Sequence, residues 1–232
     1  MRKVGEAAVI DAGQFSTEGK GKQNLRTAVN RAEREGATFE VLAPGAVRPL
    51  EAELRAVSDA WLNHHNGSEK AFSLGRFDID YLDRSPVAVA REGGRIVAFA
   101  NLLVGARGEE AMIDLMRHDP EGPHGIMDYL FTRTAQWARA EGFERLDLGM
   151  APLSGLEDRR LAPVFARVGA LVFEEGGAVY GFQGLRGYKG KFGPAWRPQF
   201  IAASTSTPLA LALLDVALLT SGGWLGLLGF RK

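Results

Sequence analysis

Cysteine is absent from the 232 residues, and this absence removes several kinds of chemistry. The chain can form no disulfide, no cysteine-based zinc site and no thiolate nucleophile. The four histidines do not replace these ligands, because His64 and His65 are adjacent, whereas His118 and His124 stand in a proline- and glycine-rich loop. Neither arrangement has the spacing of metal ligands. We therefore expect no metal site.

An excess of charge of one sign is also lacking, because 28 basic side chains balance 28 acidic ones. An anionic partner such as a nucleic acid or a membrane must then be met by local basic patches. Nucleotide-binding and hydrolase motifs are missing as well: the sequence contains no P-loop, no G-x-S-x-G elbow and no dinucleotide-binding glycine pattern.

Long apolar segments are few. The first 13 residues lack the apolar run of a signal peptide. Residues 208–228 are apolar but are interrupted by Asp215 and by Gly222 and Gly223, which makes them a poor membrane span. A helix that lies on the protein core or on a membrane surface fits this segment better, and the sequence leaves both open.

Apolar periodicity and turn residues predict a mixed α/β fold. The Gly93–Gly94 and Gly176–Gly177 pairs predict two β-hairpins. The predicted helices span residues 15–36, 47–65, 126–141 and 159–168, and the predicted strands span 7–10, 86–91, 95–104, 111–116, 145–148, 171–175 and 178–182. This order is similar to that of GCN5-related acetyltransferase-like domains, which have a mixed central sheet flanked by helices.

A basic row lies on one face of the first predicted helix. Lys22, Arg26, Asn30 and Arg34 recur every fourth residue, so they share that face. The row is either a solvated surface or a strip that contacts the phosphates of tRNA or lipid.

Two charged residues, Asp114 and Arg117, stand near the end of the strand predicted over 111–116. Strand ends in α/β sheets commonly present reactive side chains to a crevice. In acetyltransferases of this fold the next loop binds coenzyme A through backbone N–H groups. Pro120 and Pro123 each remove one such donor, which argues against coenzyme A as the donor substrate.

A second basic segment covers residues 181–198, within a stretch from Gly176 to Leu214 that contains no acid. Its basic side chains alternate with Tyr188, Phe192 and Trp196; they are Arg186, Lys189, Lys191 and Arg197. The segment is either a solvated loop or a surface whose aromatic rings stack on bases or enter a membrane interface.

Glu174 and Glu175 precede the second glycine pair. Adjacent strand residues point to opposite faces, so only one of the two carboxylates can line a pocket. That carboxylate either holds a substrate ammonium or lies on the surface.

Four segments carry a resemblance to a known family: FSTEGKGKQNLRTAVNRAEREG, MRHDPEGPHGIMDYLF, LDLGMAPLSGL and YGFQGLRGYKGKFGPAWRP. They resemble the catalytic region of the bacterial phosphatidylglycerol lysyltransferase (multiple peptide resistance factor) family, and the likeness runs from about Val9 to Leu228. A departure is the Gly177–Ala178 pair before Tyr180, where the family leads us to expect a more polar pair with an acid.

The resemblance implies a tandem of two acetyltransferase-like halves. Residues 1–44 would be the end of the first half with a basic connecting helix, 45–205 the aminoacyltransferase domain, and 206–232 an apolar helix on the core or the membrane. It also implies transfer of a lysyl or alanyl group from aminoacyl-tRNA to the headgroup hydroxyl of phosphatidylglycerol. The reaction would take place at the cytoplasmic face of the bacterial membrane, without a cofactor, and would give resistance to cationic peptides.

The resemblance also implies residue roles. Asp114 would orient or deprotonate the acceptor hydroxyl, Arg117 would hold a phosphate or the terminal ribose, and Lys189 would lie near the developing negative charge. The expected substrate-binding residues are Lys22, Arg26, Arg34, Glu174, Arg186, Tyr188 and Lys191.

Three other functions remain open. A Fem-like transferase would deliver the aminoacyl group to a peptidoglycan precursor. A coenzyme A-dependent N-acetyltransferase is disfavoured by the two loop prolines, and a shortened homologue without activity would only bind membranes or RNA.

Overall fold

The computed structural model describes residues 2–65, 75–152, 154–155, 178–202, 209–221 and 223. Seven strands form one sheet in the order β2-β3-β4-β5-β6-β1-β7. The strands are β1 (Arg2–Asp11), β2 (Thr38–Leu42), β3 (Val87–Glu92), β4 (Arg95–Val104), β5 (Glu110–His118), β6 (Arg145–Pro152) and β7 (Ala195–Ile201). The helices are α1 (Gln23–Arg34), α2 (Glu51–His64), α3 (Ile79–Leu82), α4 (Ile126–Ala140), α6 (Ala178–Gly190) and α7 (Leu209–Ser221), and 3₁₀ turns precede α1 and α2.

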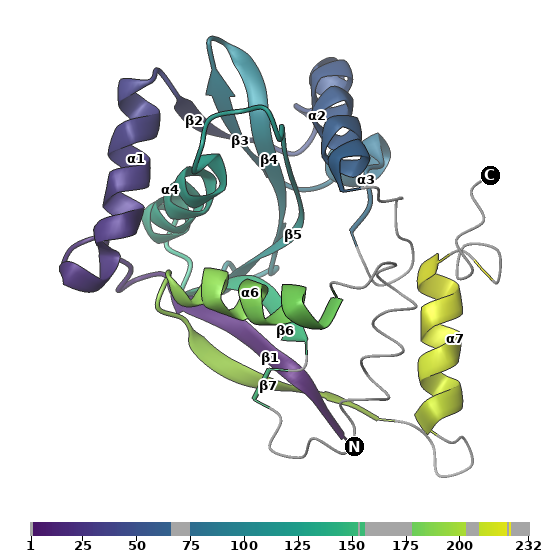
Figure 1. Ribbon diagram of the computed structural model, residues 1–232. Helices are drawn as coiled ribbons and strands as arrows, with labels where there is room; N and C mark the ends of the chain where they lie inside the picture. The colour runs from purple at the N-terminus through teal and green to yellow at the C-terminus, as the bar shows by residue number, and fades with distance from the viewer. Residues whose placement is uncertain are drawn as a thin grey trace.

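Helices cover both faces of the sheet. Helices α1 and α4 lie on one face and α2 and α3 on the other (Figure 1). Strand β3 alternates between the two cores, because Ala88 and Ala90 face α1 and α4 whereas Val87 and Val89 face α2 and α3. Helix α1 turns an apolar stripe toward the sheet, since Leu25, Val29 and Ala32 are all buried.

A β-bulge interrupts the pairing of β4 with β5. Ala100 pairs with Met116 whereas Leu102 pairs with Ile113, so β5 has one extra residue in this interval. The backbone N–H of Leu115 donates to the side-chain Oδ1 of Asn101 at 2.8 Å instead of to a strand partner. A bulge reverses the alternation of the residues that follow it.

The bulge decides which side chains face α2 and α3. The carboxylate of Asp114 accepts a hydrogen bond from Tyr81 of α3, and Leu115 belongs to the core beneath α2. The guanidinium of Arg117 lies 4.2 Å from the centre of the Trp61 ring on α2. Asp114 and Arg117 are three residues apart in a strand, yet they reach the same face of the sheet.

Strands β5 and β6 are the parallel pair of the sheet and separate early. They pair only between Glu110–Met112 and Arg145–Asp147. Beyond Asp147, β6 stays paired with β1 as far as Pro152. Figure 1 shows α6 lying across β6 and β1 near this separation.

The glycine-rich segment was predicted wrongly. Residues 178–182 were expected to form a strand, but they begin helix α6, which continues to Gly190. Close to the end of this helix, Tyr188 and Phe192 pack on Phe131 of α4, so packing against α4 prevails over the low helix propensity of glycine. Strands β2 and β7 and helix α3 were not predicted. The helix predicted over 159–168, the strand over 171–175 and the turn at 176–177 lie outside the described residues.

The predicted division at residue 44 stays a prediction. Strand β1 lies inside the sheet between β6 and β7. Figure 1 shows α1 beside α4. In the part of the chain that the structure describes, no helix combines the length and apolarity that crossing a membrane requires.

Gly5 marks the closest approach of β1 to β6. A Cβ atom there would lie 2.5 Å from the carbonyl oxygen of Ala151. Because the obstacle is the backbone of a neighbouring strand, Gly5→Ala should destabilise the protein by about 1–3 kcal/mol in urea unfolding. Gly13→Ala is the control, since its Cβ would meet only the Asp11 side chain at 3.5 Å. Equal stability of the two variants would contradict the predicted clash.

Candidate functional site

The ammonium group of Lys189 lies where β5 and β6 separate. Lys189 is 3 % exposed, and its Nζ donates to the Met150 carbonyl of β6 at 3.0 Å. A Cβ atom at Gly149 would lie 3.5 Å from this Nζ and 3.9 Å from the Ile113 carbonyl oxygen of β5. Gly149 has a φ of 84°, a conformation that favours glycine. The ammonium therefore lies against the backbone of β6, where Gly149 approaches both the ammonium and the Ile113 carbonyl of β5.

Burial changes the protonation of this lysine. Desolvation lowers the pKa of Lys189 to about 8, although the Asp147 carboxylate opposes the change. Burial also raises the pKa of Asp147, while the N–H of Gly149, donating at 2.7 Å, acts in the other direction. At neutral pH most Lys189 side chains remain charged, and a buried positive charge is well suited to stabilise an oxyanion.

Asp114 is one residue along β5 from the carbonyl that faces Gly149. Its Oδ2 accepts a hydrogen bond from the Tyr81 hydroxyl at 2.7 Å. A Cβ atom at Gly75 would lie 2.6 Å from the same oxygen, so the carboxylate is closely packed. Asp114 therefore stands on the β5 side of the separation, whereas Lys189 contacts the β6 side.

Arg117 is on the same face as Asp114 but is packed inward. The residue is 9 % exposed, its guanidinium stacks on Trp61, and its Nη1 donates to the Met116 carbonyl at 3.0 Å. A stacked guanidinium has a fixed orientation. Its place next to the Asp114 face is compatible with a role in holding substrate.

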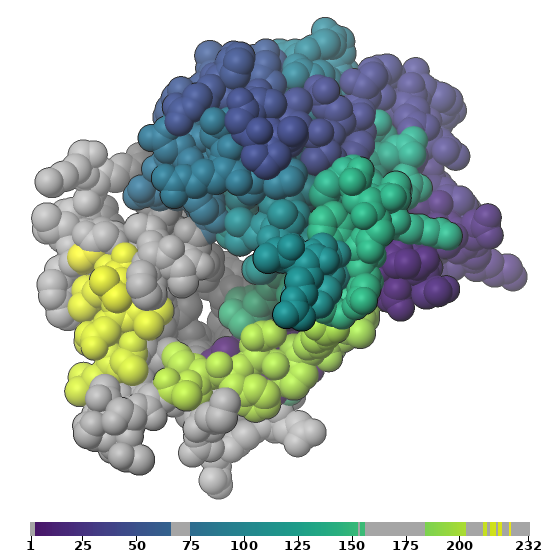
Figure 2. Space-filling view, turned by 180° about the vertical axis from the view of Figure 1, so that it is seen from behind, coloured from purple at the N-terminus to yellow at the C-terminus, as the bar shows by residue number. Residues whose placement is uncertain are grey.

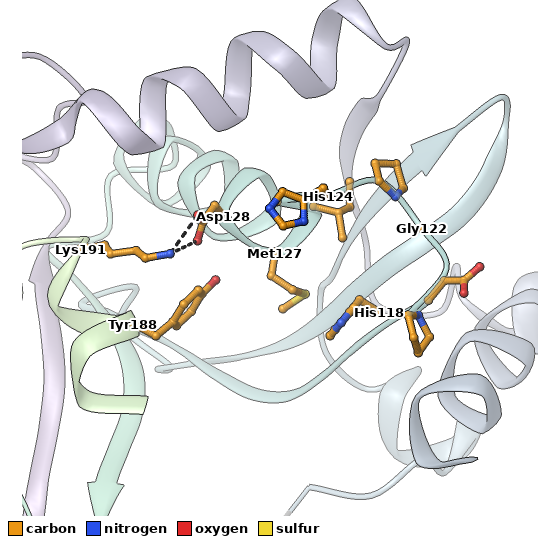
Figure 3. A pocket seen from close by; sticks show the side chains of 12 residues that line it. His118, Gly122, His124, Met127, Asp128, Tyr188 and Lys191 are labelled. Atoms are coloured by element: carbon orange, nitrogen blue, oxygen red, sulfur yellow. Dashed lines mark hydrogen bonds and ion pairs between the residues drawn. The ribbon is translucent and has the colours of Figure 1, made fainter. Parts of the chain in front are cut away.

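A cavity of about 340 Å³ opens at the amino-terminal end of α4 (Figure 3). It is lined by the loop after β5 together with Tyr188 and Lys191. Figure 2 shows this loop, in teal, next to α6 in light green. Lys191 forms an ion pair with Asp128 at 3.1 Å and lies 4.8 Å from the centre of the Tyr188 ring.

Two titratable groups in this cavity are shifted by burial. Desolvation lowers the pKa of His118, and the nearby His65 and His64 lower it further. Burial raises the pKa of Tyr188, and the Asp128 carboxylate adds to this effect. The cavity therefore presents a neutral phenol and a largely neutral imidazole at neutral pH.

The side chains of the predicted basic row on α1 make different contacts. The Nζ of Lys22 donates to the Lys191 carbonyl at 3.0 Å, which brings the start of α1 to the end of α6. Arg26 donates to the carbonyls of Thr17 and Gly19 and so holds the loop before α1. Arg34 donates to the Asn30 carbonyl, further along the helix.

Arg186 is engaged in a network that joins α6 to the sheet. Its Nη1 forms an ion pair with Glu6 of β1 and donates to the Ser154 hydroxyl at 2.8 Å. Its guanidinium lies 4.2 Å from the centre of the Trp196 ring on β7. Glu174, the last of the predicted substrate-binding residues, lies outside the described residues.

Three residues that lie close to Lys189 or Asp114 were not predicted from the sequence. Asp147 and Gly149 stand in the LDLGM motif of β6. This motif would have indicated them only if the pairing of β6 with β5 had been predicted. Tyr81 comes from the short helix α3, which gave no periodic signal. Within the described residues, no cluster of histidine and carboxylate side chains is suited to hold a metal ion.

The mixed seven-stranded sheet, covered by helices on both faces and opened between two parallel strands, is a GCN5-related acetyltransferase-like fold. The family model described as "Phosphatidylglycerol lysyltransferase, C-terminal" matches residues 1–203, and the chain belongs to this family.

Relatives in two organisms carry the same name. A phosphatidylglycerol lysyltransferase of Bacillus subtilis is 39 % identical over 215 residues, which are 92 % of this chain and 25 % of the relative. One of Staphylococcus aureus is 36 % identical over 200 residues, which are 86 % of this chain and 24 % of the relative. The chain therefore spans about a quarter of the length of these relatives.

Two solved structures are similar over most of the chain. The C-terminal domain (DUF2156) of an Agrobacterium fabrum protein assigned as a lysylphosphatidylglycerol synthetase has 44 % identity and a TM-score of 0.79, over 96 % of this chain and 67 % of that one. L-PGS from Bacillus licheniformis has 38 % identity and a TM-score of 0.78, over 94 % of this chain and 65 % of that one.

The Glu6 network gives a prediction about stability and pH. The hydrogen bond from Lys3, together with Arg186 and Ser154, lowers the pKa of Glu6 from 4.5 to about 2. A pKa lowered by folding contributes stability above the unfolded value, and this contribution is lost as the pH falls through the folded value. The wild type should lose stability between about pH 4.5 and 2, and Glu6→Gln should lose less over this interval.

Unfolding in urea at a series of pH values measures this difference. Glu18→Gln, at an exposed position, should keep the wild-type dependence. If Glu6→Gln and the wild type show the same slope, the network does not hold an ionised carboxylate.

Proposed function

We propose that this chain transfers an aminoacyl group from aminoacyl-tRNA to the headgroup hydroxyl of phosphatidylglycerol. Support comes from its membership of the phosphatidylglycerol lysyltransferase family. The observation that carries the proposal is the buried Lys189 ammonium, which contacts β6 beyond its parallel pairing with β5. Ester transfer to a hydroxyl needs a stabilised oxyanion and a proton acceptor, and we assign these roles to Lys189 and to Asp114 of β5.

The reaction needs no covalent enzyme intermediate, because the aminoacyl ester of tRNA is already activated. The acceptor hydroxyl gives its proton to Asp114, and its oxygen attacks the ester carbonyl carbon. Lys189 stabilises the negative charge on the former carbonyl oxygen. When the tetrahedral intermediate collapses, the bond to the terminal ribose oxygen breaks, and this oxygen takes the proton from Asp114.

The remaining predicted site residues position the substrates. Arg117 holds a phosphate or the terminal ribose, as a planar guanidinium can. Lys22, Tyr188 and Lys191 lie together at the end of α6 and contact the acceptor end of the tRNA. Arg186 contributes to substrate binding by holding α6 on the sheet. Arg26 and Arg34 contact phosphates along α1. Glu174 holds the ammonium group of the transferred amino acid.

The acceptor lipid places the reaction at a membrane surface. Helix α7 has two leucines, Leu211 and Leu219, that are each 54 % exposed, and exposed leucines favour the interface of a bilayer. We assign residues 206–232 to contact the membrane at its cytoplasmic face. The transferred group is lysyl or alanyl; a lysyl group adds positive charge to the lipid, which repels cationic peptides.

Two substitutions test the chemistry. Removal of one oxyanion-stabilising group typically lowers the rate by ~10²–10³, so Lys189→Ala should lower the transfer rate by about this factor. Asp114→Asn should also remove most of the activity, because an amide does not accept the proton. Transfer of radiolabelled aminoacyl groups from tRNA to phosphatidylglycerol vesicles measures both rates.

Lys20→Ala, at an exposed position, is the control and should keep the wild-type rate. Circular dichroism of each variant should match the wild type. Near-normal transfer by both site variants would remove these two assignments. Product on lipid II rather than on phosphatidylglycerol would identify a Fem-like transferase instead.

The pKa of Lys189 gives a second prediction. A cation that stabilises the oxyanion must stay protonated, and the pKa of Lys189 is about 8. The initial rate of transfer should therefore fall as the pH rises through about 8. Lys189→Arg should lose this alkaline decrease because an arginine stays charged in this range. A decrease that Lys189→Arg retains would show that another group titrates.

A further inference from the structure

The carboxylate of Asp114 is held by groups that the mechanism above does not use. The Tyr81 hydroxyl donates to Oδ2 at 2.7 Å. Burial raises the pKa of Tyr81, and the Asp114 carboxylate adds to the effect, so the phenol keeps its proton and remains a donor. This hydrogen bond engages one of the two carboxylate oxygens of Asp114.

The backbone of Gly75 lies against the same carboxylate. A Cβ atom at this position would be 2.6 Å from Oδ2, 2.9 Å from Cγ of Asp114 and 3.0 Å from Cβ of Leu115. No side chain fits there unless the carboxylate moves. The end of an aspartate rotates more easily than a strand shifts, so an added methyl group would turn the carboxylate away and keep the fold.

Asn101 joins this contact to the bulge. It is completely buried in β4, and its Oδ1 accepts from the Leu115 N–H at 2.8 Å. This amide therefore orients the backbone next to Asp114, while the Tyr81 hydroxyl binds the carboxylate. Such a network restricts both the position and the rotation of Asp114.

We propose that Tyr81 and Gly75 are positioning residues, which fix the Asp114 carboxylate so that its second oxygen meets the acceptor hydroxyl. This inference rests on the proposed function, because it assigns Tyr81 and Gly75 a role only through Asp114. Neither residue touches a reacting atom. Their contribution is the alignment of a base with its proton, and a displacement of about 1 Å can lower a rate by roughly 10².

Two variants disturb the carboxylate in different ways. Tyr81→Phe removes the hydrogen bond, and its kcat should fall about tenfold with little change in KM. Gly75→Ala keeps the tyrosine but displaces the carboxylate, and its kcat should fall by roughly 10². Tyr129→Phe is the matched control: Tyr129 is 2 % exposed, its hydroxyl lies 3.5 Å from the Ala37 carbonyl, and it belongs to the core on the other face.

A double-mutant cycle separates positioning from a general structural role. If Tyr81 acts through Asp114, Tyr81→Phe should cause no further loss of transfer in the Asp114→Asn background. Rates are measured with radiolabelled aminoacyl-tRNA and phosphatidylglycerol vesicles. The melting temperatures of Tyr81→Phe and Tyr129→Phe should lie close together, since each variant loses one hydroxyl.

The outcomes distinguish this inference from the proposed function. Additive losses in the cycle, or a normal rate for Tyr81→Phe when Asp114→Asn is inactive, would overturn the positioning role alone. If the wild-type chain transfers nothing, or if Asp114→Asn retains the wild-type rate, the proposed function fails and the positioning role fails with it.

Discussion

The early separation of β5 from β6 is the constraint on which the site depends. Parallel pairing ends at Met112 and Asp147, whereas β6 stays paired with β1 as far as Pro152. Beyond this point a lysine from α6 approaches β6, and the Met150 carbonyl accepts its hydrogen bond. A buried ammonium is costly unless it is hydrogen-bonded. The diverging strands provide this contact and keep the charge where an oxyanion can use it.

The bulge in β5 complements this separation. Regular alternation would send Asp114 and Arg117 to opposite faces of the sheet. The additional residue, held by Asn101, brings both to the face of α2 and α3. Tyr81 and Trp61 from these helices then determine how the two charged groups are oriented. The bulge in β5 and its early separation from β6 thus determine where these charged side chains lie. The regular helices and strands around them supply rigidity.

Local sequence patterns predict much of the fold, but they predict less of the candidate site. The Gly93–Gly94 hairpin and the helix ending before Gly142 follow from turn chemistry and apolar spacing, and both are confirmed. The start of α6 was predicted as a strand, because local patterns do not include the contacts with α4 that Tyr188 and Phe192 make near the other end of this helix. Asp114 and Lys189 came from motif resemblance, but Tyr81 could not be found, since its role exists only through a contact 33 residues away in the chain.

The place of β1 in the sheet has a consequence for folding. Arg2 pairs with Ile201 and Ile10 with Leu146, so both partners of this interior strand lie far from it in the sequence. Contacts of such high sequence separation slow folding because a long loop must close before they form. During synthesis on the ribosome, β1 emerges before β6 and β7 and waits for these partners with both edges unpaired. Until then its unpaired edges can pair with another nascent chain.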